Sequence, residues 1–178
     1  KVIFDGKDIT GKARHERCRA GIGRTFQIPR PFVGMTVFEN ILVGATFGRG
    51  MSERASYERC IEALDVTGLH DKANALAGSL TLLDRKRLEL ARALATEPKL
   101  LLLDEIAGGL TEAEVNDLIE EIKGLRKLGI TIVWIEHIVH ALLAVVDRIS
   151  VIQFGRNLCE GEPHDVMNSP EVQACYMG

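Results

Sequence analysis

The chain alternates between two kinds of hydrophobic pattern. Short runs that are almost continuously apolar occupy residues 99–104 and 130–135, and residues 22–26 have the pattern of a further short strand. Such runs are typical of buried strands in a parallel sheet. Segments with the apolar spacing of amphipathic helices occupy residues 13–20, 52–64 and 83–96. Strands that alternate with helices predict an α/β domain whose mainly parallel sheet is covered by helices on both faces.

Two further helices are predicted from their first turns. Thr36 and Thr111 are each followed three residues later by a glutamate, which is the pattern of a capping box. The first of these helices is expected to run to about Val43, and the second to stop at Gly129. The second also carries an apolar stripe with helical spacing, formed by Val115, Leu118, Ile119, Ile122 and Leu125.

Smaller elements are predicted near the two ends of the sequence. Residues 1–4 have the pattern of a short strand followed by a turn. After a short helix that reaches Val146, residues 148–154 predict a strand that turns at Gly155-Arg156 and returns as a hairpin. Residues 163–176 predict one or two small helices.

Composition and charge limit the possible functions. A length of 178 residues suggests one domain, and a net charge of −3 argues against a broad nucleic-acid-binding surface. We interpret the basic run Arg85-Lys86-Arg87 as a solvated helix face. The four cysteines lie far apart without a CxxC pair, so we expect reduced thiols rather than a zinc site. No apolar run approaches the roughly 18 residues that span a bilayer, so any membrane role is expected to come through a partner.

Polar side chains follow each of the three predicted strands. Gln27 follows the first strand, whereas Asp104 and Glu105 end the second. His137 comes just after the third. Because ligands bind beyond the carboxyl ends of strands in open parallel sheets, we expect these side chains to converge. A carboxylate pair there suits phosphoryl transfer, with the aspartate on Mg²⁺ and the glutamate on the attacking water.

Each of these residues also has a plain structural interpretation. The acid pair is alternatively the end of a core strand in solvent. A single histidine is more often structural than catalytic, although the place of His137, one helix and one strand after Asp104, favours a hydrogen bond to a γ-phosphate. A glutamine before a proline-containing loop, such as Gln27, is usually on the surface. Glu136 is interpreted as a solvent-facing neighbour of the histidine.

Three segments together carry a family resemblance. They are "GIGRTFQIPRPFVGMTVFENILVG" (Gly21–Gly44), "LTLLDRKRLELARALATEPKLLLLDE" (Leu80–Glu105) and "WIEH" (Trp134–His137). They resemble the ATP-binding subunit of an ABC transporter, and within that family the branched-chain (hydrophobic) amino-acid uptake group. The ending "VQACYMG" is also similar to that group. The order and spacing of these elements are specific, whereas no single element is.

The resemblance implies a fold and a division of the chain. The fold is that of a P-loop NTPase-like ABC ATPase, with a mainly parallel sheet flanked by helices and a helical subdomain. That subdomain is expected at about residues 36–97. A region from the Walker B strand to the switch histidine is expected at about 99–140, and a C-terminal hairpin with helices at about 148–178.

The resemblance also implies roles for individual residues. Gln27 matches the glutamine that touches Mg²⁺ and the attacking water. Asp104 matches the Walker B aspartate that binds the metal, and Glu105 the catalytic base. His137 matches the switch histidine. Residues 108–111 match the loop that crosses to a second subunit.

The segment Leu80–Asp84 falls where the family has its signature, Leu-Ser-Gly-Gly-Gln. Thr81 keeps a hydroxyl, and the resemblance implies that it and the backbone at Leu83 contact the nucleotide of a partner subunit. Leu82 and Leu83 replace glycines whose backbone approaches the nucleotide closely. The carboxylate of Asp84 is expected to stabilise the helix through the dipole at its N-terminus, but to repel a phosphate.

The phosphate-binding segment G-x-x-x-x-G-K-[ST] does not occur in the sequence. That loop supplies backbone amides and a lysine to the phosphates. We therefore expect the chain to be the C-terminal part of a longer domain, or alternatively a natural remnant, with weak ATP binding and negligible turnover. A missing strand is expected beside the strand of Asp104. The resulting open apolar edge favours oligomers, strand swapping or low stability.

The resemblance implies an ATP-hydrolysing subunit that uses ATP and Mg²⁺ to power import of branched-chain or related amino acids. Expected partners are membrane-spanning permease subunits, contacted through the loop at residues 28–35, and a second ATP-binding subunit, but no nucleic acid. The expected location is the cytoplasmic face of the cell membrane. Two alternatives stay open: a truncated, catalytically inactive interaction module, and a soluble ABC-type ATPase that acts on nucleic acid or ribosomes.

Overall fold

A computed structural model of the chain describes residues 1–177, with side chains through Cys175. Internal contacts divide the chain into two units, residues 1–137 and residues 138–178. Gly178, the last residue of the predicted C-terminal region and of the "VQACYMG" segment, lies outside the described residues.

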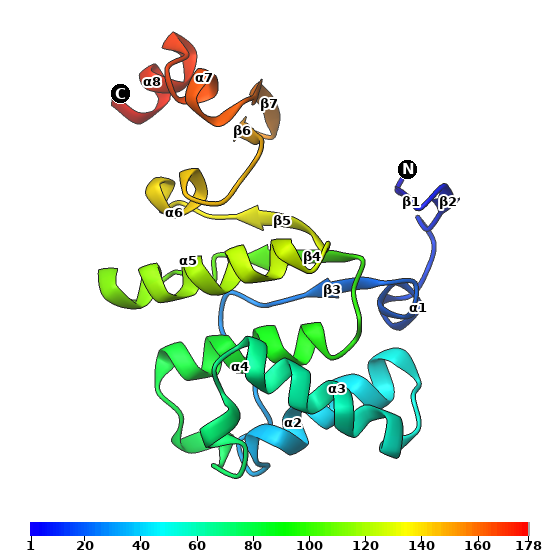
Figure 1. Cartoon of the computed structure of the whole chain (residues 1–178). Helices are drawn as coiled ribbons and strands as arrows, with labels where there is room; N and C mark the ends of the chain where they lie inside the picture. Colours follow the sequence, from blue (N-terminus) through cyan, green and yellow to red (C-terminus); the bar gives the residue numbers. More distant parts are fainter. Residues whose placement is uncertain (178) are drawn as a thin grey trace. The chain divides into compact units, whose positions relative to one another are not determined.

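The first unit begins with small elements and continues as alternating helices and strands (Figure 1). Its strands are β1 (Ile3–Phe4), β2 (Lys7–Asp8), β3 (Ile22–Arg24), β4 (Leu100–Asp104) and β5 (Thr131–Ile135). Its α-helices are α1 (Arg14–Arg19), α2 (Val37–Val43), α3 (Glu53–Val66), α4 (Leu82–Leu94) and α5 (Glu112–Lys127). One π-helical turn (Gly44–Gly48) and two 3₁₀ turns (His70–Lys72 and Ala77–Ser79) complete it.

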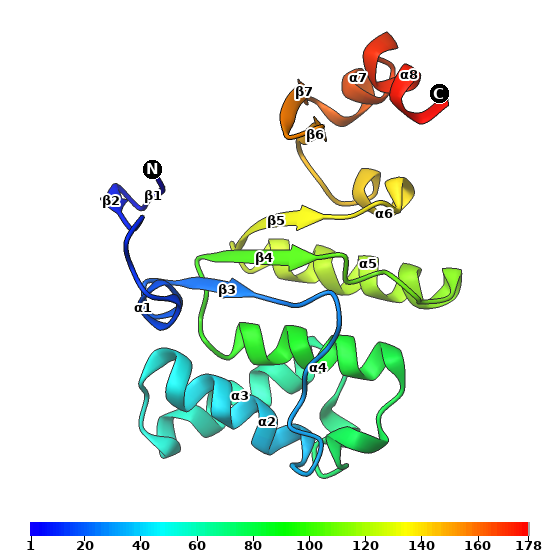
Figure 2. The same cartoon turned by 180° about the vertical axis from the view of Figure 1, so that it is seen from behind.

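Strands β3, β4 and β5 form a parallel sheet in that order. Figure 2 shows the three arrows pointing the same way, so their carboxyl ends share one edge. Since β4 is paired on both sides, the predicted open edge beside the strand of Asp104 is wrong. Within residues 1–177, β3 and β5 are the edge strands of this sheet, each paired on one side only.

Helix α5 covers one face of this sheet (Figure 1). Leu101 and Leu103 are fully buried, as is the whole predicted apolar stripe of α5. The opposite face is open: Val133 is 49% exposed and Ile135 62% exposed. The predictions of a sheet covered on both faces and of a buried strand at 130–135 are therefore wrong for the described residues. The apolar run of β5 has one half-buried face and one exposed face.

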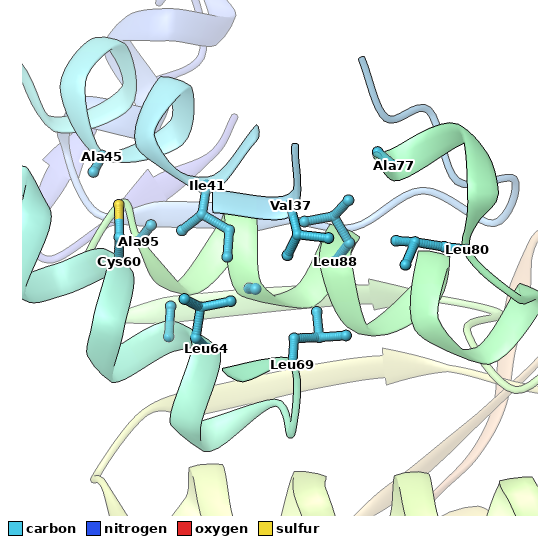
Figure 3. Close-up of a cluster of buried hydrophobic side chains, with 12 residues drawn as sticks. Val37, Ile41, Ala45, Cys60, Leu64, Leu69, Ala77, Leu80, Leu88 and Ala95 are labelled. Carbon is cyan, nitrogen blue, oxygen red and sulfur yellow. The ribbon is translucent and has the colours of Figure 1, made fainter. Parts of the chain in front are cut away.

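A second core lies among α2, α3 and α4 (Figure 3). Its helices start as the sequence predicts, with Thr36 and Ser52 as N-caps, and Thr36 completes a capping box with Glu39. Close packing also requires small residues: a Cβ built on Gly44 would lie 2.7 Å from the carbonyl oxygen of Arg92. The fully buried side chains drawn in Figure 3 include Val37, Ile41, Cys60, Leu69 and Leu88.

The basic run on α4 is not a solvated face, contrary to the sequence interpretation. Lys86 is only 4% exposed. Arg87 is mostly buried and forms an ion pair with Glu121 of α5. The apolar spacing of α4 predicted the helix correctly, but it gave no sign that charged side chains also point inward.

The second unit is built around an antiparallel hairpin. Its strands are β6 (Ile149–Gln153) and β7 (Arg156–Gly161), and its helices are α6 (Val139–Leu143), α7 (Pro163–Met167) and α8 (Pro170–Met177). The turn consists of Phe154 and Gly155, one residue earlier than predicted, and both have positive φ, as a type I′ turn requires. Among residues 1–177, no helix combines the length and apolar character of a membrane span.

Candidate functional site

The carboxyl ends of the three parallel strands bring together three of the predicted site residues. Gln27 donates a hydrogen bond from Nε2 to Oε2 of Glu105, at 2.7 Å. Nδ1 of His137 lies 3.8 Å from the same oxygen. Glu105 is therefore the central side chain, with one neighbour from beyond β3 and one from beyond β5. The convergence is as expected from a parallel sheet, whereas the catalytic roles stay predictions.

The backbone at Glu105 has a conformation that non-glycine residues rarely adopt. Its φ is +45°, in the left-handed region. The sheet ladder continues up to this point, because the Glu105 amide donates to the carbonyl of Ile135 at 2.9 Å. The chain then turns, and the Gly108 amide donates back to the Glu105 carbonyl at 3.2 Å. Left-handed backbone at such a residue costs about 1–3 kcal/mol and is often found at functional sites.

Asp104 is held by a cation that sequence reasoning missed. Nη2 of Arg24 lies 2.9 Å from Oδ2 of Asp104, and its guanidinium group also lies over the ring of Phe26, 5.4 Å from the centroid. The two charged residues meet because Arg24 on β3 is paired in register with Leu102 on β4. Strand register is not visible in the sequence, so no local signal pointed to this pair.

The residues at this edge can supply few direct ligands for Mg²⁺. Asp104 offers a partly exposed carboxylate, and Gln27 offers an amide oxygen while its Nε2 donates to Glu105. No group of three or more histidine, cysteine or acidic side chains among residues 1–177 could hold a metal ion. Mg²⁺ usually keeps several waters and binds through one or two carboxylates plus substrate phosphates. The donor set therefore fits Mg²⁺ only as a partner of a phosphate ligand.

In the predicted nucleotide-contacting segment before α4, the polar side chains are hydrogen-bonded to groups of this chain. The hydroxyl of Thr81 donates to Oδ2 of Asp84 at 2.8 Å and accepts from the Asp84 amide at 3.2 Å. Nζ of Lys72 lies 2.5 Å from the same carboxylate oxygen. Burial acts to raise the pKa of Asp84, but hydrogen bonds from Lys72 and Thr81 bring it below its ordinary value. The carboxylate is thus an internal, paired charge, and its expected repulsion of a phosphate stays a prediction.

The two leucines that replace the signature glycines differ in exposure. Leu83 is buried, whereas Leu82 is partly exposed. A Cβ on Gly109 would lie 3.2 Å from Cδ2 of Leu82, so this side chain approaches the loop after β4. Among residues 1–177, neither Thr81 nor Leu83 forms a hydrogen bond with the group around Glu105. The chain therefore does not bring these two predicted residues into that group.

Glu136 was interpreted as solvent-facing, and this is wrong. Its side chain is fully buried. Oε1 accepts the amide of Ala107 at 2.9 Å, and Oε2 accepts the amide of His137 at 3.0 Å. The residue joins the end of β5 to the turn after β4. In the sequence, only the position of Glu136 directly before His137 pointed to this residue. That position does not show whether its side chain is buried or exposed.

Comparison with known proteins shows which family the chain resembles. The sequence model of the ABC transporter family matches residues 1–108, which is more than half of the chain. The chain is 35% identical over 189 residues to a probable branched-chain amino acid transport ATP-binding protein, LivG, of Archaeoglobus fulgidus, covering 100% of this chain and 74% of the relative. It is 36% identical over 192 residues to the high-affinity branched-chain amino acid transport ATP-binding protein BraF of Pseudomonas aeruginosa, with coverage of 99% and 75%.

A solved structure extends the likeness to three dimensions. The chain superposes with a TM-score of 0.86 and 31% identity on the ADP conformation of an ATP-binding cassette of an ABC transporter, covering 98% of this chain and 75% of that one. The predicted ABC ATPase fold is thereby confirmed. From its sequence match, its relatives and its fold, the chain belongs to the ABC transporter family of ATP-binding proteins.

Proposed function

We propose that the chain acts in an ATP-binding and ATP-hydrolysing subunit that powers membrane import of branched-chain or related amino acids. The contact of Glu105 with Gln27, and its approach to His137 at the sheet edge, is the observation that carries the enzymatic part. The solute class is supported by the names of the two relatives, which both belong to branched-chain amino acid transport. The structural relative with ADP supports the nucleotide.

The proposed chemistry divides the work among the residues at the strand ends. Glu105 is the base that orients or deprotonates the attacking water, and His137 donates a hydrogen bond to the γ-phosphate. Asp104 and Gln27 are the residues that would hold Mg²⁺, which neutralises charge on the phosphates when bound. Because Arg24 pairs with Asp104, it would compete with a bound cation for this carboxylate.

Two partners complete the proposal. A second ATP-binding subunit would place its signature segment over the site, while Thr81 and Leu83 of this chain, together with residues 108–111, would face the nucleotide of that subunit. Membrane-spanning permease subunits would contact the loop at residues 28–35, where Ile28, Phe32 and Val33 are exposed apolar side chains. With such contacts the protein would lie at the cytoplasmic face of the membrane. Exposed apolar side chains gathered on one loop support a protein-binding surface.

A second candidate function is an interaction module without catalysis. Two observations favour it: the 178 residues contain no phosphate-binding G-x-x-x-x-G-K-[ST] segment, and the Thr81 hydroxyl is engaged with Asp84. The predicted weak ATP binding and negligible turnover of the chain would fit both candidates. The two candidate functions can be distinguished when the phosphate-binding segment is added to the chain.

The test is therefore made on the chain and on a fusion that adds a phosphate-binding segment of the family. Mg²⁺-dependent ATP binding is measured by calorimetry, and turnover by phosphate release. The ATPase proposal expects turnover in the fusion and a loss of about 10²- to 10⁴-fold in Glu105→Gln, as for removal of a general base. Glu112→Gln, an exposed acid on α5, is the matched control. A fusion that binds ATP but shows no turnover, or an unimpaired Glu105→Gln, would favour the interaction module.

A further inference from the structure

The turn that carries Glu105 is held from the neighbouring strand by a buried carboxylate. Oε1 of Glu136 accepts the amide of Ala107, which lies two residues beyond Glu105 and is fully buried. Oε2 of Glu136 accepts the amide of His137. One carboxylate thus fixes both the turn after β4 and the residue after β5. These two segments carry the side chains that approach each other at 3.8 Å.

Such a carboxylate needs a counter-charge, because a buried charge without a partner is strongly unfavourable. Nδ1 of His137 lies 3.4 Å from Oε2 of Glu136. Lys86 of α4 adds a buried positive charge that acts on the same carboxylate. This lysine is almost fully buried, and its ammonium group interacts electrostatically with Glu136 and, more weakly, with Glu105. Burial lowers the pKa of Lys86, and the two carboxylates oppose that effect.

We propose that Glu136 is a positioning residue which, with Lys86 as its buried counter-charge, fixes Glu105 against Gln27 and His137. The inference rests on the proposed function, because it names the residues that arrange the same site. Neither residue needs to touch the substrate. Their effect passes through the backbone of the turn at Ala107 and through the charge balance around Glu105. The left-handed backbone at Glu105 makes such an external support necessary, since the turn is strained by itself.

The first test uses the ¹⁵N-labelled 178-residue chain without nucleotide. Hydrogen exchange of the Ala107 amide reports the Glu136 bond, and the NMR signal of the Gln27 side-chain amide reports its contact with Glu105. Glu136→Gln keeps the size but loses the charge, whereas Glu136→Asp keeps the charge but shortens the reach. Both are expected to speed Ala107 exchange about tenfold, as for loss of one hydrogen bond to a charged acceptor. Both should also shift the Gln27 signal towards its position in Glu105→Ala.

The matched control is Glu114→Gln. Glu114 also accepts a backbone amide, that of Thr111, but at the start of α5. It should leave Ala107 exchange and the Gln27 signal unchanged. If Glu136→Gln unfolds the chain, Glu136→Asp carries the test. Unchanged Ala107 exchange with an unchanged Gln27 signal in a folded Glu136 variant would overturn the proposal. None of these measurements uses ATP, so they can succeed even where the ATPase proposal fails.

A second set of variants tests the counter-charge. Lys86→Met should speed Ala107 exchange, and Lys86→Arg, which restores the positive charge, should return it towards the value of the unaltered chain. In the double variant Lys86→Met/Glu136→Gln, exchange should be no faster than in Glu136→Gln alone, because the two residues act as one unit. Fully additive acceleration in the double variant would show that Lys86 acts independently and would remove it from the proposal.

Discussion

Gln27 donates a 2.7 Å hydrogen bond to Glu105 across 78 residues of sequence. The contact joins the segment beyond β3 to the turn beyond β4. The two side chains that are proposed to handle the attacking water are thus direct neighbours. The fold of the first unit alone is sufficient to place them.

The Arg24–Asp104 pair predicts a competition between an internal cation and a bound one. Arg24→Gln should free the Asp104 carboxylate and tighten binding of Mg²⁺, or of Mn²⁺ used as a spectroscopic substitute. Partly exposed pairs are worth about 0.2–1 kcal/mol, so a gain of up to about fivefold is expected. The measurement is a Mn²⁺ titration by electron paramagnetic resonance in the presence of ATP, made on the fusion that carries the phosphate-binding segment. Arg30→Gln is the control, because Arg30 also lies over Phe26. Equal affinities in all three proteins would contradict the competition.

The helical core should depend strongly on Leu88. This side chain is fully buried among α2, α3 and α4. Leu88→Ala removes buried apolar contacts and leaves a cavity, so the free energy of unfolding should fall by about 2–5 kcal/mol in urea denaturation. Leu128→Ala, at a position that is 61% exposed, should change it by less than about 0.5 kcal/mol. A loss of similar size in both variants would mean that the core lies elsewhere.

Two glycine-to-alanine changes should have opposite signs. In Gly44→Ala the new methyl group would meet the carbonyl oxygen of Arg92 at 2.7 Å, so backbone must move, and a loss of about 1–3 kcal/mol is expected. In Gly124→Ala, within α5, the methyl group meets nothing within 4 Å. Alanine there should stabilise the helix by about 0.5–1 kcal/mol. Thermal unfolding of the two variants distinguishes the cases, and a stabilising Gly44→Ala would contradict the packing described.

The capping boxes predict a loss of stability in acid. The backbone amide of Thr111, and then its hydroxyl, hold the pKa of Glu114 below its ordinary value of 4.5. A carboxylate with a lowered pKa in the folded state stabilises the protein above the unfolded pKa, and this contribution disappears as pH falls through the folded pKa. The free energy of unfolding should therefore decrease below pH 4.5 less steeply in Glu114→Gln than in the unaltered chain.

The control for this pH profile is Glu112→Gln, in the same first turn of α5. Among residues 1–177, Glu112 accepts no hydrogen bond. It should leave the slope unchanged. Glu39 of α2 provides a second case, because the amide and hydroxyl of Thr36 lower its pKa in the same way. Identical slopes for Glu114→Gln and Glu112→Gln would show that the box at Thr111 does not form in solution.

Local patterns predicted the elements well, because their causes lie within a few residues. The capping boxes at Thr36 and Thr111 begin α2 and α5 as expected, and Gly129 follows the end of α5 with a positive φ. Most strands were also found, to within two residues at their ends, but β2 (Lys7–Asp8) lies in a segment that was predicted as a turn. The rule that parallel strands share a carboxyl edge was enough to predict that Gln27 and Glu105 lie close together.

What could not be predicted depends on partners that are distant in sequence. The pairing of Arg24 with Asp104 follows from strand register. The burial of Lys86 and Glu136 follows from how α4 and the end of β5 lie against the turn after β4. Predictions from hydrophobic periodicity assume that charged residues face the solvent, so they were wrong for Lys86 and Glu136. Periodicity also could not show that one face of β5 is exposed, since apolar residues occupy both faces of that strand.

If Glu105 is the base that we propose, its left-handed backbone makes thermal stability and activity favour different amino acids at this position. Glycine would relax the turn at little steric cost, and it would also delete the carboxylate. A variant library selected only for thermal survival should therefore accumulate glycine at this position, whereas a library selected for nucleotide turnover should keep glutamate. The amino acid found at position 105 after selection would therefore show whether stability or turnover was selected.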